Sequence, residues 1–172
     1  MNFGDQPIIT ERLSIEPMSP GDTEFIFELL NTEGWLEFIG NRNITSLTDA
    51  DAYIKKILGN SSVLYWVVRH NATTDKLGVV TYIKRDYLEY NDIGFAFLPR
   101  FANNGYAYEA ANALLRHLVK ERDLKHILAT TIPENIKSIK LLKKIGLTFE
   151  KEITIDNETL HVYSASLKEL QD

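Results

Sequence analysis

The stretch best suited to binding chemistry is a short run of small and turn-forming residues placed directly before a long helical pattern. Its members are Asn103, Asn104, Gly105, Tyr106 and Ala107. The first amides of a helix have no partner inside the helix, and the peptide dipoles place partial positive charge there. Gly adopts left-handed backbone geometry freely and Asn tolerates it, so a ligand can approach these amides closely. The stretch therefore predicts a phosphate or diphosphate site, although an ordinary turn before a core helix fits the same residues.

Several other kinds of site are disfavoured by what the sequence lacks. It contains no GxGxxG and no GxxxxGK motif, which removes a dinucleotide fingerprint and a P-loop. It has no cysteine, and its four histidines show no HxxxH spacing, so we expect neither a thiol nucleophile nor a metal site. A net charge of −5 argues against a nucleic-acid partner. No signal peptide is recognisable and no apolar run approaches the ~20 residues of a membrane span, so we expect a cytoplasmic protein without membrane contact.

The elements around this stretch must hold it in place. Residues 92–98 form a dense apolar run that predicts a strand, and apolar residues recur at helical spacing from Ala107 to Leu118. A strand thus leads through a turn into the start of an amphipathic helix. The other expected elements are strands at 9–17, 63–68, 77–83, 126–132, 147–155 and 159–167. Helices are expected after Ser19, after Ser46 or Thr48, and after Asn135.

The spacing of apolar residues also predicts two features of the N-terminal half of the chain. Residues 33–40 show no clear periodicity and are predicted to be a loop that packs through Trp35 and Phe38. The helix that follows is predicted to bury Tyr53, Ile54, Ile57 and Leu58. The element order predicts an α/β fold on one mixed sheet, and neither the length nor the composition divides residues 1–172 into more than one domain.

Four segments, taken in this order, resemble the GNAT acetyltransferase superfamily, and in particular its branch of ribosomal-protein-alanine N-acetyltransferases (Rim type). They are TERL from Thr10, DIGF from Asp92, FANNGYAYEA from Phe101 and PENIKS from Pro133. The likeness extends over nearly the whole chain. It implies a twisted, mostly antiparallel sheet of about seven strands with helices on both faces, in which two central parallel strands, 92–98 and 126–132, splay apart.

The resemblance further implies acetyl-CoA as cosubstrate, lying in the gap between those strands. Backbone groups near Phe97 and Leu98 would pair with the pantetheine arm, and amides from about Asn103 to Ala107 would hold the diphosphate. Asn103 stands where the family usually has Gly. The remaining candidate contacts are Asn135, near the thioester, and Lys144, at the phosphates, although the Lys143-Lys144 pair is also typical of a solvated surface.

An acceptor amine is mostly protonated at neutral pH, so a carboxylate must remove a proton before the amine attacks the thioester. Asp92, at the start of the central strand, is the candidate base, and it is equally an ordinary strand-start residue. Many family members protonate the leaving thiolate with a Tyr at the position that Leu142 holds here. The branch that this chain resembles uses the Ser of its Asn-x-x-Ser motif, which makes Ser138 the candidate acid; a residue in a capped helix turn is the alternative.

The family also places the region between the first two helices on the acceptor side. Glu33, Trp35 and Phe38 are therefore candidate substrate residues, with core packing of the aromatics and solvent exposure of Glu33 as the alternative. The leading hypothesis is an N-acetyltransferase that acts on a peptide or protein N-terminus or on a small amine, as a monomer or a homodimer. The competing hypothesis is a non-catalytic acyl-CoA-binding or regulatory module with the same fold.

Overall fold

The computed structural model describes residues 5–122 and 124–166. These residues form eight strands, five α-helices and two single-turn 3-10 helices. The strands are β1 (Ile8–Ile9), β2 (Leu13–Pro17), β3 (Val63–His70), β4 (Lys76–Ile83), β5 (Asp92–Phe97), β6 (His126–Thr131), β7 (Thr148–Ile155) and β8 (Glu158–Ser166). The helices are η1 (Pro20–Asp22), α1 (Thr23–Leu30), α2 (Glu33–Phe38), α3 (Leu47–Leu58), η2 (Pro99–Phe101), α4 (Tyr106–Arg122) and α5 (Ile136–Lys144).

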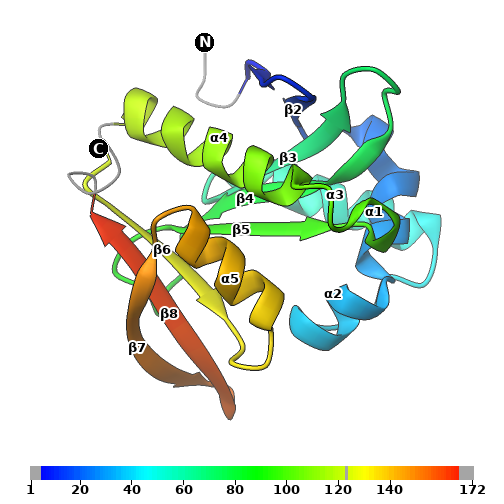
Figure 1. The fold of residues 1–172 in the computed structure, drawn as a ribbon. Coiled ribbons are helices and arrows are strands. Elements are labelled where there is room, and N and C mark those ends of the chain that lie inside the picture. The colour runs from blue at the N-terminus through cyan, green and yellow to red at the C-terminus, as the bar shows by residue number, and fades with distance from the viewer. Residues whose placement is uncertain (1–4, 123, 167–172) are drawn as a thin grey trace.

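All eight strands join in one twisted sheet of order β1-β2-β3-β4-β5-β6-β8-β7 (Figure 1). Each neighbouring pair is antiparallel except β5 and β6, which are parallel. The mixed, mostly antiparallel α/β sheet that the sequence predicted is confirmed. The first strand, predicted at 9–17, is divided into β1 and β2 by a turn in which the Thr10 N–H donates to the Leu13 carbonyl, and this accounts for the strand beyond the expected seven.

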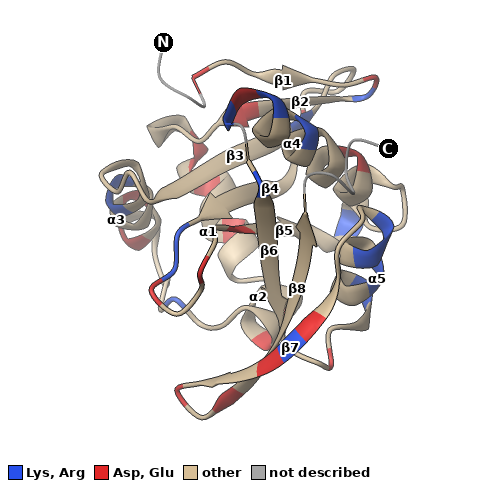
Figure 2. Cartoon of the chain, turned by 90° about the vertical axis from the view of Figure 1, so that its left-hand side faces the viewer, with Lys and Arg blue, Asp and Glu red and all other residues tan. Residues whose placement is uncertain are grey.

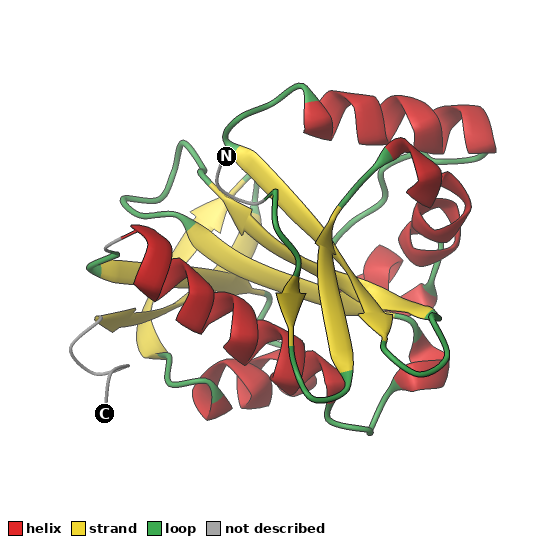
Figure 3. Ribbon diagram, turned by 90° about the horizontal axis from the view of Figure 1, so that it is seen from above, coloured by secondary structure: helices red, strands yellow, loops and turns green. Residues whose placement is uncertain are grey.

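Helices cover both faces of the sheet, so the protein has two hydrophobic cores (Figure 3). Helices α4 and α5 pack on one face, where Leu114, Leu118 and Leu142 are buried. Helices α1, α2 and α3 pack on the other face, where Ile26 and Ile54 are buried. Strand side chains alternate between the two cores, as a period of two requires. Trp66 belongs to the first core, for example, and Val67 to the second.

Two expectations about the first half were wrong. Residues Glu33–Phe38 form helix α2 and not a loop, because the Thr32 side chain caps the helix by accepting from the Trp35 amide. The helix is too short to show a periodic pattern in the sequence. In α3, Leu58 is 50% exposed, because it is the last residue of the helix. Leu167, the predicted end of the last strand, lies outside the described residues.

Candidate cofactor and catalytic site

Strand β5 is paired along one edge and almost unpaired along the other. On the β4 side, six residue pairs are in register, from Gly78 with Phe97 to Ile83 with Asp92. On the β6 side only Asp92 is paired, with Leu128. Beyond that pair the two strands diverge (Figure 1), and residues 94–97 stay half-buried although their strand is central. The splayed parallel pair is therefore present.

The backbone groups of Phe95 and Phe97 face this gap. In an antiparallel ladder, alternate residues exchange hydrogen bonds with the partner strand. The Leu98 N–H donates to the Leu77 carbonyl at 2.8 Å, so Phe97 and Phe95 direct their own N–H and C=O groups away from β4. Phe97 thus fits its expected role. The Leu98 N–H is paired with Leu77, and its carbonyl accepts from the Phe101 N–H at 3.1 Å, so a pantetheine contact at Leu98 stays a prediction. Sequence reasoning missed Phe95, which the period of two would have indicated.

The turn that follows β5 has the backbone geometry that a close ligand approach requires. Asn103 and Gly105 adopt left-handed φ angles of 63° and 78°. The side-chain amide of Asn104 donates to the carbonyls of Phe101 at 3.3 Å and Ala102 at 3.0 Å, which closes the turn on itself. Residues 102–105 are all exposed. The left-handed geometry that the sequence predicted for this stretch is present at Asn103 as well as at the glycine.

The start of α4 presents free amides beside this turn. The Glu109 N–H donates to the Gly105 carbonyl at 3.0 Å and makes the first bond of the helix. The amides of Tyr106 and Ala107 therefore precede the helical hydrogen-bond pattern and have no acceptor within the helix. Together with the helix dipole, they form a positive concavity suited to an anion.

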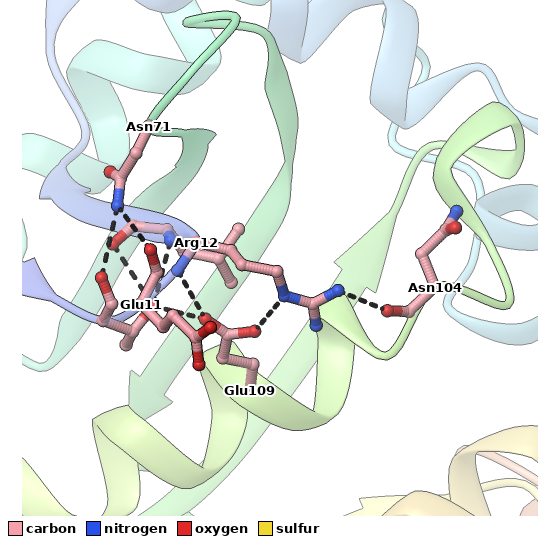
Figure 4. A network of polar contacts seen from close by, with 7 residues as sticks. Glu11, Arg12, Asn71, Asn104 and Glu109 are labelled. Atoms are coloured by element: carbon pink, nitrogen blue, oxygen red, sulfur yellow. Dashed lines mark hydrogen bonds and ion pairs between the residues drawn. The ribbon is translucent and has the colours of Figure 1, made fainter.

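An ion pair that sequence reasoning missed braces this turn from the N-terminal strands (Figure 4). Arg12 Nε lies 2.7 Å from Glu109 Oε2. The Arg12 N–H and the Thr10 hydroxyl donate to Glu109 Oε1 at 3.0 Å and 2.6 Å. Arg12 Nη1 donates to the Asn104 carbonyl at 2.9 Å, and the guanidinium lies 4.6 Å from the centre of the Tyr106 ring. The first strands and the start of α4 are thus tied together at the predicted anion site.

Asp92 is a buried carboxylate at the point where β5 and β6 part. Its Oδ2 accepts from Arg85 Nε at 2.7 Å and from the Thr130 hydroxyl at 3.4 Å. Its Oδ1 is buried and has no hydrogen-bond partner among the described residues. Burial raises the pKa of Asp92 above its ordinary value of 3.8, and the ion pair with Arg85 lowers it only in part. A buried carboxylate oxygen without a donor is costly, which is the kind of exception that calls for an explanation.

The two candidate acid–base residues belong to opposite faces of the sheet. Within β5, Ile93 packs in the core beneath α4 and Ala96 packs against the core of α1–α3. Strand alternation puts Asp92 on the side of Ala96. Ser138 lies in the first turn of α5, whose Leu142 is buried in the α4 core. Asp92 and Ser138 therefore come to the region of the gap from different sides.

Helix α5 begins as the sequence predicted. Asn135 caps it, because its Oδ1 accepts from the Ser138 N–H at 3.2 Å. At the other end, Lys144 Nζ lies 4.2 Å from the centre of the Tyr108 ring, which brings the end of α5 beside the first turn of α4. Lysines follow the exposed side of α5, whereas acidic residues predominate on β7 (Figure 2). The end of α5 therefore adds positive charge on the side of α4.

The three candidate substrate residues do not share one environment. Trp35 is 4% exposed and belongs to the core of α1–α3, with its indole N–H unpaired in the described structure. Phe38 is half-buried and Glu33 is exposed. Core packing is therefore the better interpretation of Trp35, while a role for Phe38 and Glu33 at the acceptor stays a prediction.

Comparison with known proteins agrees with this geometry. Residues 12–148 match the acetyltransferase (GNAT) domain family. The chain belongs to the GNAT acetyltransferases. It is 31% identical to an uncharacterized N-acetyltransferase, YnaD, of Bacillus subtilis over 94% of this chain and 96% of that protein. It is also similar to a GNAT-family acetyltransferase structure from Bacillus anthracis, with 28% identity, a TM-score of 0.81 and coverage of 95% of this chain and all of the other.

One more distant solved structure is relevant to the Rim-type branch, which the sequence motifs resemble. RimL, a ribosomal L7/L12 alpha-N-protein acetyltransferase solved with coenzyme A, has a TM-score of 0.81 at 13% identity. The likeness covers 94% of this chain and 98% of that one. At this identity it shows a common fold. Membership of the GNAT family is thus secure, whereas the Rim-type branch rests on distant structures.

GNAT acetyltransferases use acetyl-CoA, and the residues of this chain fit such a group. Gly105 and Asn103 leave the backbone open at the turn, amides without helical acceptors follow it, and the strand gap exposes the polar groups of Phe95 and Phe97. Across the described ranges, no group of three or more acidic or histidine side chains is placed to hold a metal ion. None of the helices in those ranges is long and apolar enough to cross a membrane.

Proposed function

We propose that this protein is an acetyl-CoA-dependent N-acetyltransferase that transfers the acetyl group to a primary amine by direct attack in a ternary complex. The observation that carries the proposal is the half-open edge of β5. It leads at one end into the amide-rich start of α4 and has a buried carboxylate, Asp92, at the other. Membership of the GNAT family supports the same reaction class.

In this proposal each part of the site has one task. The amides from Asn103 to Ala107 bind the diphosphate, and the backbone of Phe95 and Phe97 orients the pantetheine arm along the gap. Asn135 closes the far wall, and Lys144 adds charge near the phosphates. Acetyl-CoA, when bound, supplies an acetyl thioester whose carbonyl carbon is the electrophile.

Asp92 acts as the base. Its Oδ1 has no donor, whereas Oδ2 is held by Arg85 and Thr130, so the carboxylate is oriented and one oxygen is available for an acceptor N–H. Burial raises the pKa of Asp92, so its carboxylate is a stronger base than that of an exposed aspartate. The acceptor amine approaches from the face of α1–α3, where Asp92 lies.

Ser138 acts as the acid that protonates the leaving thiolate. The residue at the position of the usual family Tyr, Leu142, is 1% exposed in the α4 core and carries no proton to donate. Ser138 is half-buried in the first turn of α5. Its hydroxyl, directly or through a water, donates the proton that the thiolate requires.

The acceptor is a peptide or protein N-terminus or a small amine. A Rim-type acceptor is suggested by the sequence motifs, and RimL shares the fold. The decisive test is coenzyme A release from acetyl-CoA with a panel of N-terminal peptides, polyamines and amino sugars, with acetylated products identified by mass spectrometry. Turnover with at least one amine, abolished when that amine is omitted, is the expected result.

A non-catalytic acyl-CoA-binding module is the second candidate, and the burial of Leu142 where many relatives carry an acid favours it. One experiment distinguishes the two candidate functions. Tight coenzyme A binding by calorimetry without turnover on any acceptor would support the module and overturn the enzyme. Failure to bind coenzyme A would overturn both.

A further inference from the structure

Arg12 contacts the predicted diphosphate loop from outside the α4 sequence. Its side chain is 40% exposed, so the charge is near solvent and not buried in the core. Nη1 holds the Asn104 carbonyl at 2.9 Å, and Nε meets Glu109 at 2.7 Å. Nη2 lies 3.4 Å from the position that a Cβ on Gly105 would take, and it has no hydrogen-bond partner within the described residues. The third arm of the guanidinium is thus available beside the loop (Figure 4).

The guanidinium is held in this position by a chain of contacts. Glu109 accepts from the Thr10 hydroxyl and the Arg12 amide as well as from the side chain of Arg12. Asn71, in the turn between β3 and β4, donates through its N–H to the Arg12 carbonyl at 2.8 Å and through its side chain to the Thr10 carbonyl at 3.2 Å. Because arginine presents a rigid planar fork, two fixed arms also fix the direction of the third.

Glu109 would disfavour an anion if it stood alone, since it lies in the first turn of α4. Partial burial raises the pKa of Glu109, but the hydrogen bonds from Thr10 and Arg12 outweigh that effect and leave the pKa below its ordinary value. The carboxylate is therefore ionised at neutral pH. Its charge is matched by Arg12, which lies between Glu109 and the loop.

We propose that Arg12 is a positioning residue for diphosphate binding: it ties the Asn104 carbonyl back, so that the loop amides face the ligand, and it adds positive charge at the start of α4. The inference rests on the proposed function in that the ligand is coenzyme A. The competing explanation is that Arg12 only neutralises Glu109 and has no effect of its own on the loop.

The test compares R12Q, R12K, E109Q and the double variant R12Q/E109Q with the wild type. K55Q is the matched control, because Lys55 loses the same charge from an exposed ion pair with Asp51 on α3. Three quantities are measured: coenzyme A affinity by calorimetry, kcat/KM with acetyl-CoA and with S-acetylpantetheine, which lacks the diphosphate, and hydrogen exchange of amides 103–106 in the ligand-free protein.

R12Q should weaken coenzyme A binding about 10-fold to 100-fold, the range for losing a charge-assisted hydrogen bond. It should speed exchange at 103–106 and leave kcat/KM with S-acetylpantetheine within about twofold of wild type, the scatter of a surface change. R12K should fall between R12Q and wild type, because it keeps the charge and loses the fork. The double variant should bind as weakly as R12Q, and K55Q should resemble wild type in every measurement.

Two results would overturn the inference. If R12Q/E109Q recovers wild-type affinity, Arg12 only neutralises Glu109. If R12Q alters neither affinity nor exchange, Arg12 does not position the loop. A wild-type protein that fails to bind coenzyme A would instead remove the proposed function, and the exchange comparison would still decide whether Arg12 holds the loop.

Discussion

The two edges of β5 have the same backbone and opposite roles. Along β4, pairing is continuous from Asp92 to Phe97, and the strands pack so closely that glycines are needed at contact points. Along β6, pairing stops after Asp92 and leaves the strand half-exposed in the middle of the sheet. The paired edge stabilises the fold. The unpaired edge leaves main-chain donors and acceptors for a ligand, which a complete sheet would not.

The comparison also explains the position of Asp92. It is the one residue of β5 that is paired on both sides, so its backbone is fixed. Its side chain is buried and ion-paired with Arg85, which fixes the carboxylate as well. The proposed proton acceptor is therefore fixed by strand pairing on both sides and by its ion pair. Substitutions at the two edges of β5 test this contrast.

The first prediction concerns the carboxylate at the end of the open edge. Asp92→Asn should lower kcat by about 100-fold to 10,000-fold, the range for losing a general base, while coenzyme A affinity changes less than about threefold. Steady-state kinetics and calorimetry on the same samples check this. An equal loss of binding and turnover would indicate that Asp92 shapes the gap and is not the base.

The pH dependence of this variant tests the same assignment. Because burial raises the pKa of Asp92 above 3.8, wild-type turnover should rise with pH through that higher pKa, and Asp92→Asn should lack this acidic limb. The effect of this pKa on folding stability has the opposite sign: stability falls as the pH rises. A carboxyl group whose pKa is raised in the folded state stabilises the fold at low pH, and this contribution is lost as the pH rises through the folded-state pKa. Asp92→Asn should therefore lose less stability than the wild type over this pH range.

The second prediction concerns the loop at the other end of the open edge. Gly105→Val should weaken coenzyme A binding about 10-fold to 100-fold, since a β-branched residue at a φ of 78° is strained by about 1–3 kcal/mol. Calorimetry measures the affinity. Gly34→Val is the control, because a Cβ at Gly34 meets nothing within 4 Å. If both substitutions weaken coenzyme A binding equally, the loop has no specific role in cofactor binding.

The third prediction concerns the paired edge. A Cβ at Gly78 would lie 2.6 Å from Phe97 Cγ and closer still to the Ala96 carbonyl, so Gly78→Ala should destabilise the fold by about 1–3 kcal/mol. Urea unfolding gives the free energy. Variant molecules that remain folded should bind coenzyme A nearly normally. An unchanged free energy of unfolding would show that β4 and β5 do not pack closely at Gly78.

The fourth and smallest effect is expected at Ser138. Ser138→Ala should reduce kcat about 10-fold, less than the about 100-fold to 10,000-fold typical of a proton donor because a water can replace the hydroxyl, and leave coenzyme A affinity unchanged. The Asn135 cap uses the Ser138 amide and not its hydroxyl, so the helix should keep its stability. Single-turnover kinetics measures the chemical step. Wild-type turnover in this variant would remove Ser138 as the acid.

Local sequence signals were sufficient for much of the fold. The Asn135 cap and the left-handed turn at Asn103 and Gly105 depend on residues a few positions apart. Helix α2 was missed because six residues are too few for a periodic signal and its cap, Thr32, is a common residue. That the Leu98 amide is already paired could not be predicted, because its partner, Leu77, lies on another strand.

By itself, the sequence predicted most of the strands and helices and the open turn before α4, and its motifs, taken in order, showed a resemblance to the family. The family resemblance implied that the strands at 92–98 and 126–132 splay apart, and the structure has this gap. Only the tertiary structure decided that one oxygen of Asp92 is buried without a donor, and that Arg12 meets Glu109 across 97 residues of chain. The reason is physical. Caps, turns and periodicity arise from neighbouring residues, whereas burial, ion pairing and the strand edge left unpaired depend on how distant segments pack together.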